Sequence, residues 1–444
     1  MRYRYRSDDE LKDSGVEWIG NIPKDWSISR IDKEFKVRNE KVSDKEYPPL
    51  SVTKQGILPQ LENVAKSDNS DNRKKVCVGD FVINSRADRK GSCGVSSYDG
   101  SVSLICNVLT SRKLHPRYVH SLFRNYYFSE EFYRWGSGIV DDLWSTNIEK
   151  MKKINIPIPS KNEDVKIANF LDEKTSQFDS IISKKEKLIE RLEEAKKSLI
   201  SEVVTGKVKV VKTDDGYELI KRSSEEMKDS GVEWLGEIPK EWDIKRLRFL
   251  GKLQNGISKS SDSFGYGYPF VSYSNVYRNI ELPHIVEGLV NSTEEERKIY
   301  SVEEGDVFFT RTSETVEEIG FASTCMKTID NSTFAGFLIR FRPNDKRLYK
   351  GFSKYYFRCD LNRKYFVKEM NLVTRASLSQ NLLNNLSVVL PKYEEQVEIY
   401  NALELKVSYI NLSINKLKYQ IEKLKEAKQS LISEAVTGKI EILD

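Results

Sequence analysis

Two sequence segments each occur twice in this 444-residue chain, and this internal repeat constrains the fold more than any other feature. The stretch KDSGVEWIGNIPKDW at residues 12–26 returns with three changes as KDSGVEWLGEIPKEW at residues 228–242. The stretch ERLEEAKKSLISEVVTGKV at residues 190–208 returns as EKLKEAKQSLISEAVTGKI at residues 422–440. The chain therefore consists of two halves that share a beginning and an end.

The middles of the two halves correspond only in short stretches. VGDFVINSR, which starts at Val78, resembles EGDVFFTRT, which starts at Glu304. YPPLS at Tyr47 resembles YPFVS at Tyr268. The repeated ends were kept while the contents between them diverged.

The charge of the chain is concentrated in these variable middles. The whole chain carries a formal net charge of +5, whereas residues 27–153 carry +6 and residues 243–386 carry +4. A basic surface confined to the variable parts favours contact with a polyanion such as nucleic acid, although charge alone also fits a random surface scatter.

Composition predicts a globular protein of the cytoplasm that does not enter a membrane. Hydrophobic residues make up 39% of the chain, which is enough for several packed cores. No apolar run approaches the roughly 20 residues of a membrane span, and the start MRYRYRSDDE lacks the apolar stretch of a signal peptide. The five cysteines form no C-x-x-C pair, as expected for reduced thiols.

Each half is predicted to end in one long helix. Residues 163–204 contain no glycine or proline, and a matching helix is expected over residues 395–436. Both helices stop at a Thr-Gly pair, where glycine can take the left-handed conformation. The second helix carries apolar residues mostly at alternating steps of four and three: Leu403, Val407, Ile410, Ile414, Leu417, Ile421, Leu424, Ala427 and Leu431. The first carries the matching seam, with Lys185 as its one break.

Two matched seams in one chain predict an antiparallel coiled coil, with recruitment of a partner helix as the alternative. The middles mix short β-rich runs with helical segments and close on INIPIP and LSVVLP. The predicted fold class is α+β, with two mixed α/β globular domains separated by two long antiparallel coiled-coil helices in a pseudo-twofold repeat.

The predicted domain boundaries follow the repeats. They are an N-terminal repeated segment (1–26), a first variable domain (27–159), a central long helix (160–206), a linker with the second copy of the repeated segment (207–242), a second variable domain (243–391) and a C-terminal long helix (392–444).

Motifs of catalysis are missing from the sequence. Neither Gly-Lys pair is part of a Walker A loop, and the three histidines form no H-E-x-x-H motif. YPPL at Tyr47 lacks both ends of an amino-methyltransferase loop. We predict no catalytic, cofactor-binding or metal-binding residue in this chain.

Two divergent basic domains held apart by a rigid helix pair would read two different short DNA sequences at a fixed separation. Phosphate contacts would supply affinity, and polar side chains would read base edges in the major groove. Candidate reading residues occur at equivalent places in both halves, after an early strand and after the Gly-Asp strand. They are Lys54, Gln55, Arg86, Arg89, Lys90 and Ser92 in the first half, and Tyr273, Asn275, Arg278, Arg311 and Ser313 in the second.

The repeated motifs resemble one known family. The G-V-E-W-[IL]-G-x-I-P-x-x-W segments, the E-[DQ]-V-x-I helix starts and the A-K-x-S-L-I-S-E-x-V-T-G-K helix ends are similar to those of type I restriction-modification specificity subunits. The likeness covers essentially the whole chain. It implies that the variable domains are target recognition domains and that the chain itself neither cleaves nor methylates DNA.

The resemblance also implies the partners. These are double-stranded DNA, two modification subunits that bind S-adenosylmethionine and methylate adenine, and restriction subunits that use ATP and Mg. The AKKSLISEVV, AKQSLISEAV and GVEW segments would contact the modification subunits. Two alternatives stay open at this point: a solitary DNA-binding regulator or antagonist without catalytic partners, and an enzyme whose site carries no recognisable motif.

Overall fold

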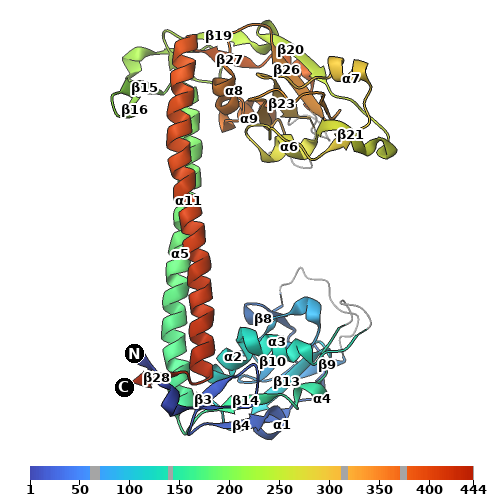
Figure 1. Ribbon diagram of the computed structural model, residues 1–444, viewed down its shortest axis with the longest axis vertical. Coiled ribbons are helices and arrows are strands. Elements are labelled where there is room, and N and C mark those ends of the chain that lie inside the picture. Colours follow the sequence, from blue (N-terminus) through green and yellow to red (C-terminus); the bar gives the residue numbers. More distant parts are fainter. Residues whose placement is uncertain (61–70, 139–143, 312–318, 371–377, 444) are drawn as a thin grey trace. The chain divides into compact units, whose positions relative to one another are not determined.

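The computed structural model describes the chain except for residues 61–70, 139–143, 312–318, 371–377 and 444. The chain divides into two compact units (Figure 1). Unit 1 comprises residues 1–186 and 417–444, and unit 2 comprises residues 187–416. The long helices α5 (Glu163–Val204) and α11 (Tyr393–Val436) each contribute one part to each unit.

Unit 1 is a mixed domain. Its shorter helices are α1 (Ile31–Glu34), α2 (Pro116–Arg124), α3 (Tyr126–Arg134) and α4 (Ile148–Met151). Its strands are β1 (Arg2–Tyr5), β2 (Leu11–Asp13), β3 (Asn21–Pro23), β4 (Ser27–Arg30), β5 (Phe35–Val37), β6 (Lys41–Val42), β7 (Leu50–Thr53), β8 (Gly56–Pro59), β9 (Arg73–Val76), β10 (Phe81–Asn84), β11 (Cys93–Val95), β12 (Gly100–Val102), β13 (Cys106–Ser111), β14 (Asn155–Ile158) and β28 (Ile440–Leu443).

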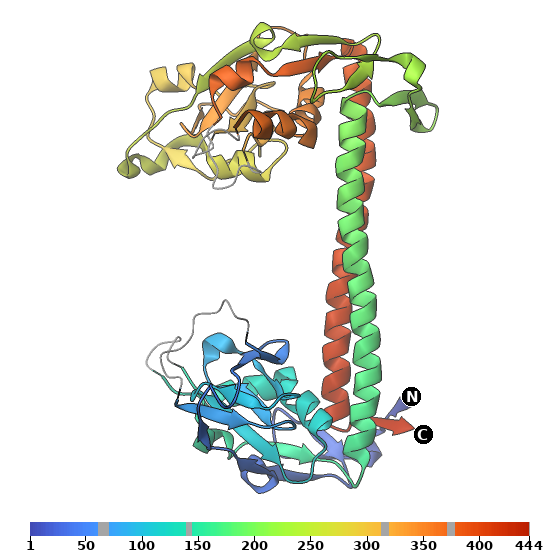
Figure 2. The same cartoon turned by 180° about the vertical axis from the view of Figure 1, so that it is seen from behind.

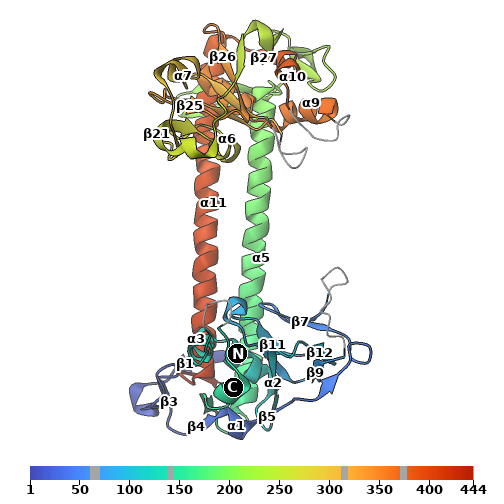
Figure 3. The same cartoon turned by 90° about the vertical axis from the view of Figure 1, so that its right-hand side faces the viewer.

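The central sheet of unit 1 is antiparallel, in the order β11-β10-β13-β5. Figure 3 labels its outer strands, β11 and β5. Successive side chains of a strand point to opposite faces. Phe81 and Ile83 accordingly join the core under α2 and α3, whereas Val82 joins a smaller core with β7, β8, β9 and β12. The first three residues of β10, FVI, are apolar without alternation because both faces of this strand are covered.

Unit 2 repeats this plan. Its shorter helices are α6 (Tyr273–Arg278), α7 (Glu294–Ile299), α8 (Lys350–Tyr356), α9 (Asp360–Met370) and α10 (Gln380–Asn384). Its strands are β15 (Val208–Thr213), β16 (Gly216–Lys221), β17 (Met227–Asp229), β18 (Glu237–Pro239), β19 (Asp243–Arg246), β20 (Gly251–Asn255), β21 (Phe264–Val271), β22 (Leu289–Val290), β23 (Val307–Thr310), β24 (Ala322–Thr324), β25 (Thr333–Phe334), β26 (Leu338–Pro343) and β27 (Ser387–Leu390).

The central sheet of unit 2 has the order β24-β23-β26-β20, so that β24, β23, β26 and β20 correspond to β11, β10, β13 and β5. The burial pattern matches as well. Val307 and Phe309 join the core under α8, and Phe308 joins a second core on the other face. The two variable domains are therefore versions of one fold.

Each repeated segment packs on the start of a long helix through the same contacts. In unit 1, the Glu163 carboxylate accepts hydrogen bonds from Arg6 Nη2 and from Trp26 Nε1, both at 2.6 Å. In unit 2, the Glu395 carboxylate accepts from Arg222 Nη2 at 2.9 Å and from Trp242 Nε1 at 3.0 Å. These contacts explain why arginine, tryptophan and glutamate recur at these positions.

Glycines end both long helices, as the sequence predicts. Gly206 has φ of +75° and Gly438 has φ of +73°, in the left-handed region. A Cβ atom at Gly206 would lie 2.4 Å from Pro239 Cγ, and one at Gly438 would lie 2.5 Å from Pro23 Cδ. Glycine is therefore required twice over, for backbone conformation and for close approach.

The strands after the long helices also pair equivalently. In unit 2, β15 and β16 form a hairpin in which Val208 faces Lys221. In unit 1, β28 pairs with β1 in the same register, Ile440 facing Tyr5, although these strands lie at opposite ends of the sequence (Figure 2). The hairpin of unit 2 thus has a counterpart in unit 1 without a connecting turn.

The long helices run antiparallel within unit 1, as predicted. Lys428 Nζ contacts Asp179 Oδ1 at 2.6 Å, and Lys185 Nζ donates to Gln420 Oε1 at 2.8 Å. Residues later in α5 thus contact residues earlier in α11, as in an antiparallel pair. In unit 2, Lys196 Nζ donates to Asn411 Oδ1 at 3.1 Å. Lys185, the predicted break in the seam, thus has a polar partner on the facing helix.

Burial supports most of the predicted seam. Ile182, Ile414 and Ile421 are buried, whereas Ala427 is exposed. A straight α-helix has 3.6 residues per turn and drifts from a seven-residue repeat, so not every position of a heptad pattern stays on the contact line.

Candidate nucleic-acid interface

In unit 1, Lys54 and Gln55 form the tip of the β7–β8 hairpin. Both residues are exposed. Thr53 Oγ1 accepts from the Gln55 backbone N–H at 3.1 Å and donates to the Gly56 carbonyl at 2.9 Å. The turn is closed by its own side chain and presents a cation and an amide outward.

The second predicted segment of unit 1 follows β10. Arg86 and Arg89 are exposed, and Asn84 Oδ1 accepts from the Arg86 backbone N–H at 3.1 Å. Lys90 lies 2.5 Å from the Glu130 carboxylate. Ser92 is only 5% exposed, and its carbonyl accepts from the Asn84 N–H at 3.0 Å. Ser92 therefore closes the loop, and Arg86 and Arg89 are its outward-facing cations.

In unit 2, the segment after β21 is a short helix, α6, rather than a loop. Asn275 Oδ1 accepts from the Ser272 backbone N–H and from Ser272 Oγ, both at 2.8 Å, in a capping box. The Tyr273 ring stacks on Tyr277 with centroids 5.9 Å apart. Arg278 is exposed at the end of the helix. The structure thus gives Asn275 a capping contact and leaves Arg278 as the outward cation of α6.

Arg311 directly follows β23 and is half-buried; counted from the buried aspartate before the strand, it corresponds to Ser85, one residue before Arg86. The Arg311 backbone N–H donates to the Phe337 carbonyl at 3.0 Å, and its carbonyl accepts from the Leu378 N–H at 2.8 Å. Ser313, the other candidate of this segment, lies outside the described residues.

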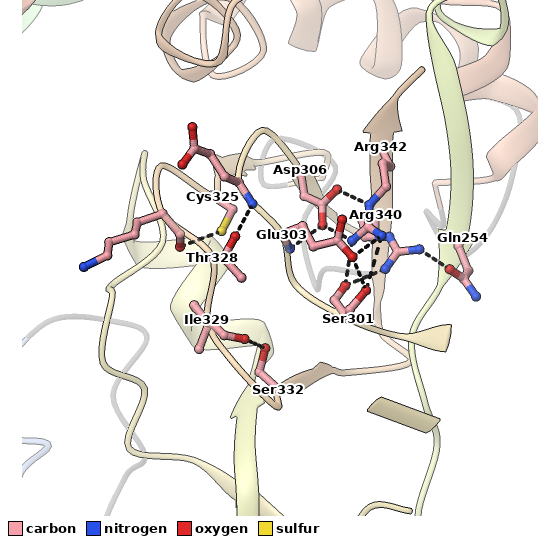
Figure 4. A network of polar contacts seen from close by, with 12 residues as sticks. Gln254, Ser301, Glu303, Asp306, Cys325, Thr328, Ile329, Ser332, Arg340 and Arg342 are labelled. Atoms are coloured by element: carbon pink, nitrogen blue, oxygen red, sulfur yellow. Dashed lines mark hydrogen bonds and ion pairs between the residues drawn. The ribbon is translucent and has the colours of Figure 1, made fainter. Parts of the chain in front are cut away.

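A buried aspartate anchors the start of each of these central strands. In unit 2, Asp306 is 1% exposed and accepts from Arg342 Nε at 2.7 Å and from the Glu303 N–H at 2.8 Å (Figure 4). Burial raises the pKa of Asp306, and the Arg342 guanidinium opposes this rise.

In unit 1, Asp80 is 1% exposed and accepts from Arg38 Nε at 2.6 Å and from the Cys77 N–H at 2.8 Å. The conserved Gly-Asp pair of the two halves is therefore a structural anchor that fixes the strands leading to Arg86 and Arg311.

Sequence reasoning missed a cationic cavity in unit 2. It has a volume of about 540 Å³ and is lined by parts of α5, α6, α8, α9 and α11. Arg278 borders it, together with Lys197, Arg358 and Arg363. These cations come from segments distant in sequence, so no local pattern indicated their proximity.

Among the described residues, no group of three or more histidine, cysteine, aspartate or glutamate side chains is arranged to hold a metal ion. No helix in that part of the chain has the length and hydropathy needed to cross a bilayer.

Two sheets of identical strand order, each adjoining segments with exposed cations, match the arrangement that the sequence predicts for two related nucleic-acid-recognition modules. Residues 239–423 match the family profile of the type I restriction modification DNA specificity domain. These residues therefore carry a type I restriction modification DNA specificity domain, and the chain is similar to type I restriction enzyme specificity subunits.

Relatives match along nearly the whole chain. The EcoKI type I restriction enzyme specificity subunit of Escherichia coli K12 is 23% identical, over 95% of this chain and 90% of that protein. A specificity subunit assigned to the MjaX type I restriction enzyme of Methanocaldococcus jannaschii is 25% identical, over 96% of each chain.

A solved structure shares the fold. It is described as "Structural basis underlying complex assembly and conformational transition of the type I R-M system". Its chain superimposes with a TM-score of 0.69 at 15% identity, covering 94% of this chain and 99% of that one.

Proposed function

We propose that this protein is the DNA-recognition subunit of a type I restriction-modification enzyme. It reads an asymmetric target in two half-sites, one by each variable domain, and it is not itself the catalyst. The observation that carries this proposal is the pair of sheets with one strand order and different exposed side chains at their ends. Equal folds with different reading residues suit two unequal half-sites.

The proposed reading chemistry follows from side chains that are exposed, with the exception of Arg311, which is half-buried. Arginine binds guanine bidentately through O6 and N7, and glutamine binds adenine through N6 and N7. We assign Arg86 and Gln55 to base edges in the first half-site and Arg278 and Arg311 to the second. Lys54 is suited to phosphate, because its single ammonium is a point charge without a fixed donor fork.

We also propose that two modification subunits dock on the long helices. Large apolar side chains lie exposed there in each unit, away from the buried seam: Ile181 (44%) and Tyr419 (64%) in unit 1, and Leu188 (45%), Tyr409 (59%) and Leu412 (63%) in unit 2. Exposed apolar residues on a helix that already has a partner favour a further protein contact.

Neither tryptophan of the repeated GVEW segments is exposed, so these segments offer less apolar surface than the long helices. Trp18 is 9% exposed and packs edge-on against Phe128, with ring centroids 5.6 Å apart. We therefore expect the helix surfaces, including the AKKSLISEVV and AKQSLISEAV segments, to supply most of the contact with the modification subunits.

The remaining parts of the enzyme belong to its partners. We propose that S-adenosylmethionine is bound by the modification subunits, and that ATP and Mg are used by restriction subunits. Because its substrate is cellular DNA, we propose the cytoplasm as the place of action.

The test is to map methylated adenines in cells that express the chain with its modification subunits. The expected result is one motif made of two unequal half-sites with an unspecified gap. A single continuous motif, or methylation by the purified chain alone with S-adenosylmethionine, would contradict the proposal. The modification subunits are also expected to co-purify with the chain.

A further inference from the structure

An arginine occupies the same place in both units. Arg124 ends α2, and Arg358 lies two residues beyond α8. Each arginine directly follows a phenylalanine. Nine residues before each arginine, at His115 and at Tyr349, a backbone N–H donates to a side chain near the start of a long helix. The His115 N–H donates to Asp164 Oδ2 at 2.7 Å, and the Tyr349 N–H donates to Gln396 Oε1 at 2.8 Å.

In unit 1, Arg124 ties the hairpin tip to the central sheet. Its Nη2 donates to the carbonyl of Lys54, and its Nη1 donates to the carbonyl of Cys93, both at 2.6 Å. Cys93 lies on β11, which pairs with β10 next to the Arg86 loop. One guanidinium thus joins the backbones of the two regions that carry candidate reading residues.

In unit 2, Arg358 does the same for α6. Its Nη2 donates to the Tyr277 carbonyl at 2.8 Å, and its Nη1 donates to the Val276 and Ala322 carbonyls at 3.0 Å. The last carbonyls of a helix have no partner within the helix, and Arg358 satisfies two of them. Ala322 begins β24, the strand equivalent to β11.

The geometry explains why arginine stands at both positions. The guanidinium is a planar fork with five N–H donors and can hold several carbonyls in fixed directions, which a lysine ammonium cannot do. Within the described residues, neither guanidinium has a carboxylate within 4.0 Å, so its hydrogen bonds serve the loop backbones. Arg358 also lies over the Phe321 ring, 4.4 Å from the centroid.

We infer that Arg124 and Arg358 are positioning residues for DNA recognition, each holding the backbone of one reading segment and thereby setting the base selectivity of one half-site. The inference rests on the proposed function. Arg124 holds the Lys54 carbonyl, which is in the peptide bond to the proposed base reader Gln55, and Arg358 holds the carbonyls of the two residues before Arg278. A loosened clamp therefore changes where Gln55 and Arg278 point. Neither arginine has to touch DNA.

The experiment uses the full chain co-expressed with its modification subunits. Methylation is measured at the cognate target and at targets with one changed base in either half-site. Arg124→Gln is expected to relax discrimination roughly tenfold in the half-site of the first variable domain and to leave the other unchanged, because one well-placed base contact is worth about that factor. Arg358→Gln is expected to do the reverse.

Matched controls are available on both units. Arg117→Gln alters an exposed arginine of the same helix α2, which pairs with Asp172 at 2.5 Å. Arg347→Gln alters an exposed arginine that donates to the Phe249 carbonyl at 2.8 Å. Both controls are expected to leave the preferences of both half-sites within twofold of the wild type.

Lysine variants keep the test decisive if a glutamine variant does not fold. Arg124→Lys and Arg358→Lys retain the charge but hold fewer carbonyls, so they are expected to relax the same half-site by a smaller factor. Unchanged preferences, equal relaxation of both half-sites, or a uniform loss of methylation at all sites would overturn the inference. A wild-type chain that yields no bipartite motif would instead refute the proposed function.

Discussion

Replacing Gly206 by alanine is expected to destabilise unit 2 by about 2–5 kcal/mol. The residue has φ of +75°, which costs an alanine roughly 1–2 kcal/mol. The added Cβ would also lie 2.4 Å from Pro239 Cγ and 2.9 Å from Trp242 Cη2, and such overpacking typically costs about 1–3 kcal/mol. Urea unfolding followed by tryptophan fluorescence measures the loss, with Trp242 as a reporter next to the change.

A second glycine separates the two contributions. Gly231 has φ of +67°, but nothing lies within 4 Å of a Cβ built there. Gly231→Ala is therefore expected to lose only the roughly 1–2 kcal/mol of backbone strain. In unit 1 the corresponding comparison is Gly438→Ala against Gly15→Ala. If both glycine-to-alanine variants of a pair lost the same free energy of unfolding, the close packing of the helix-ending glycine on the repeated segment would be refuted.

Three further predictions test other parts of the structure. Burial lowers the pKa of His120 to about 4. The free energy of unfolding should therefore fall by at most about 3 kcal/mol as the pH drops from about 6.5 to 4. Denaturation measured across this pH range should show the loss in the wild type but not in His120→Gln. Glu163→Ala leaves Arg6 and Trp26 Nε1 without their shared acceptor and should cost about 3–5 kcal/mol in urea unfolding, whereas a loss below 1 kcal/mol would show that this contact is dispensable. Exchanging residues 243–386 for the equivalent domain of a relative should change one half-site only, and methylation mapping that finds both half-sites altered would contradict modular reading.

The repeats and the helices could be predicted closely from the sequence. The first long helix has the expected bounds, Glu163–Val204, and the second begins at Tyr393, two residues before the expected start. Local signals sufficed here, because a long run without glycine or proline, ended by a Thr-Gly pair, depends on no distant residue. The sheet orders depend on distant pairings and could not be derived.

The candidate interface was predictable in its location and less so in its details. Arg86 is exposed as expected, but Ser92 is buried because its backbone closes the same loop. The Ser272-x-x-Asn275 spacing is that of a capping box and could have indicated the helix α6. Arg124 and Arg358 went unnoticed, since their partners are backbone carbonyls, which carry no sequence signal.

The pairing of β1 with β28 makes the order of the two halves along the polypeptide a matter of convention. The strands β15 and β16 are joined by the Asp214-Asp215 turn, whereas the equivalent strands β28 and β1 are joined only by hydrogen bonds. If a similar turn linked β28 to β1, the backbone would be a closed ring. A circular permutant that opens the Asp214-Asp215 turn and links β28 to β1 by a similar one would retain every strand pair. Its first-translated reading module would then be the one that now comes second.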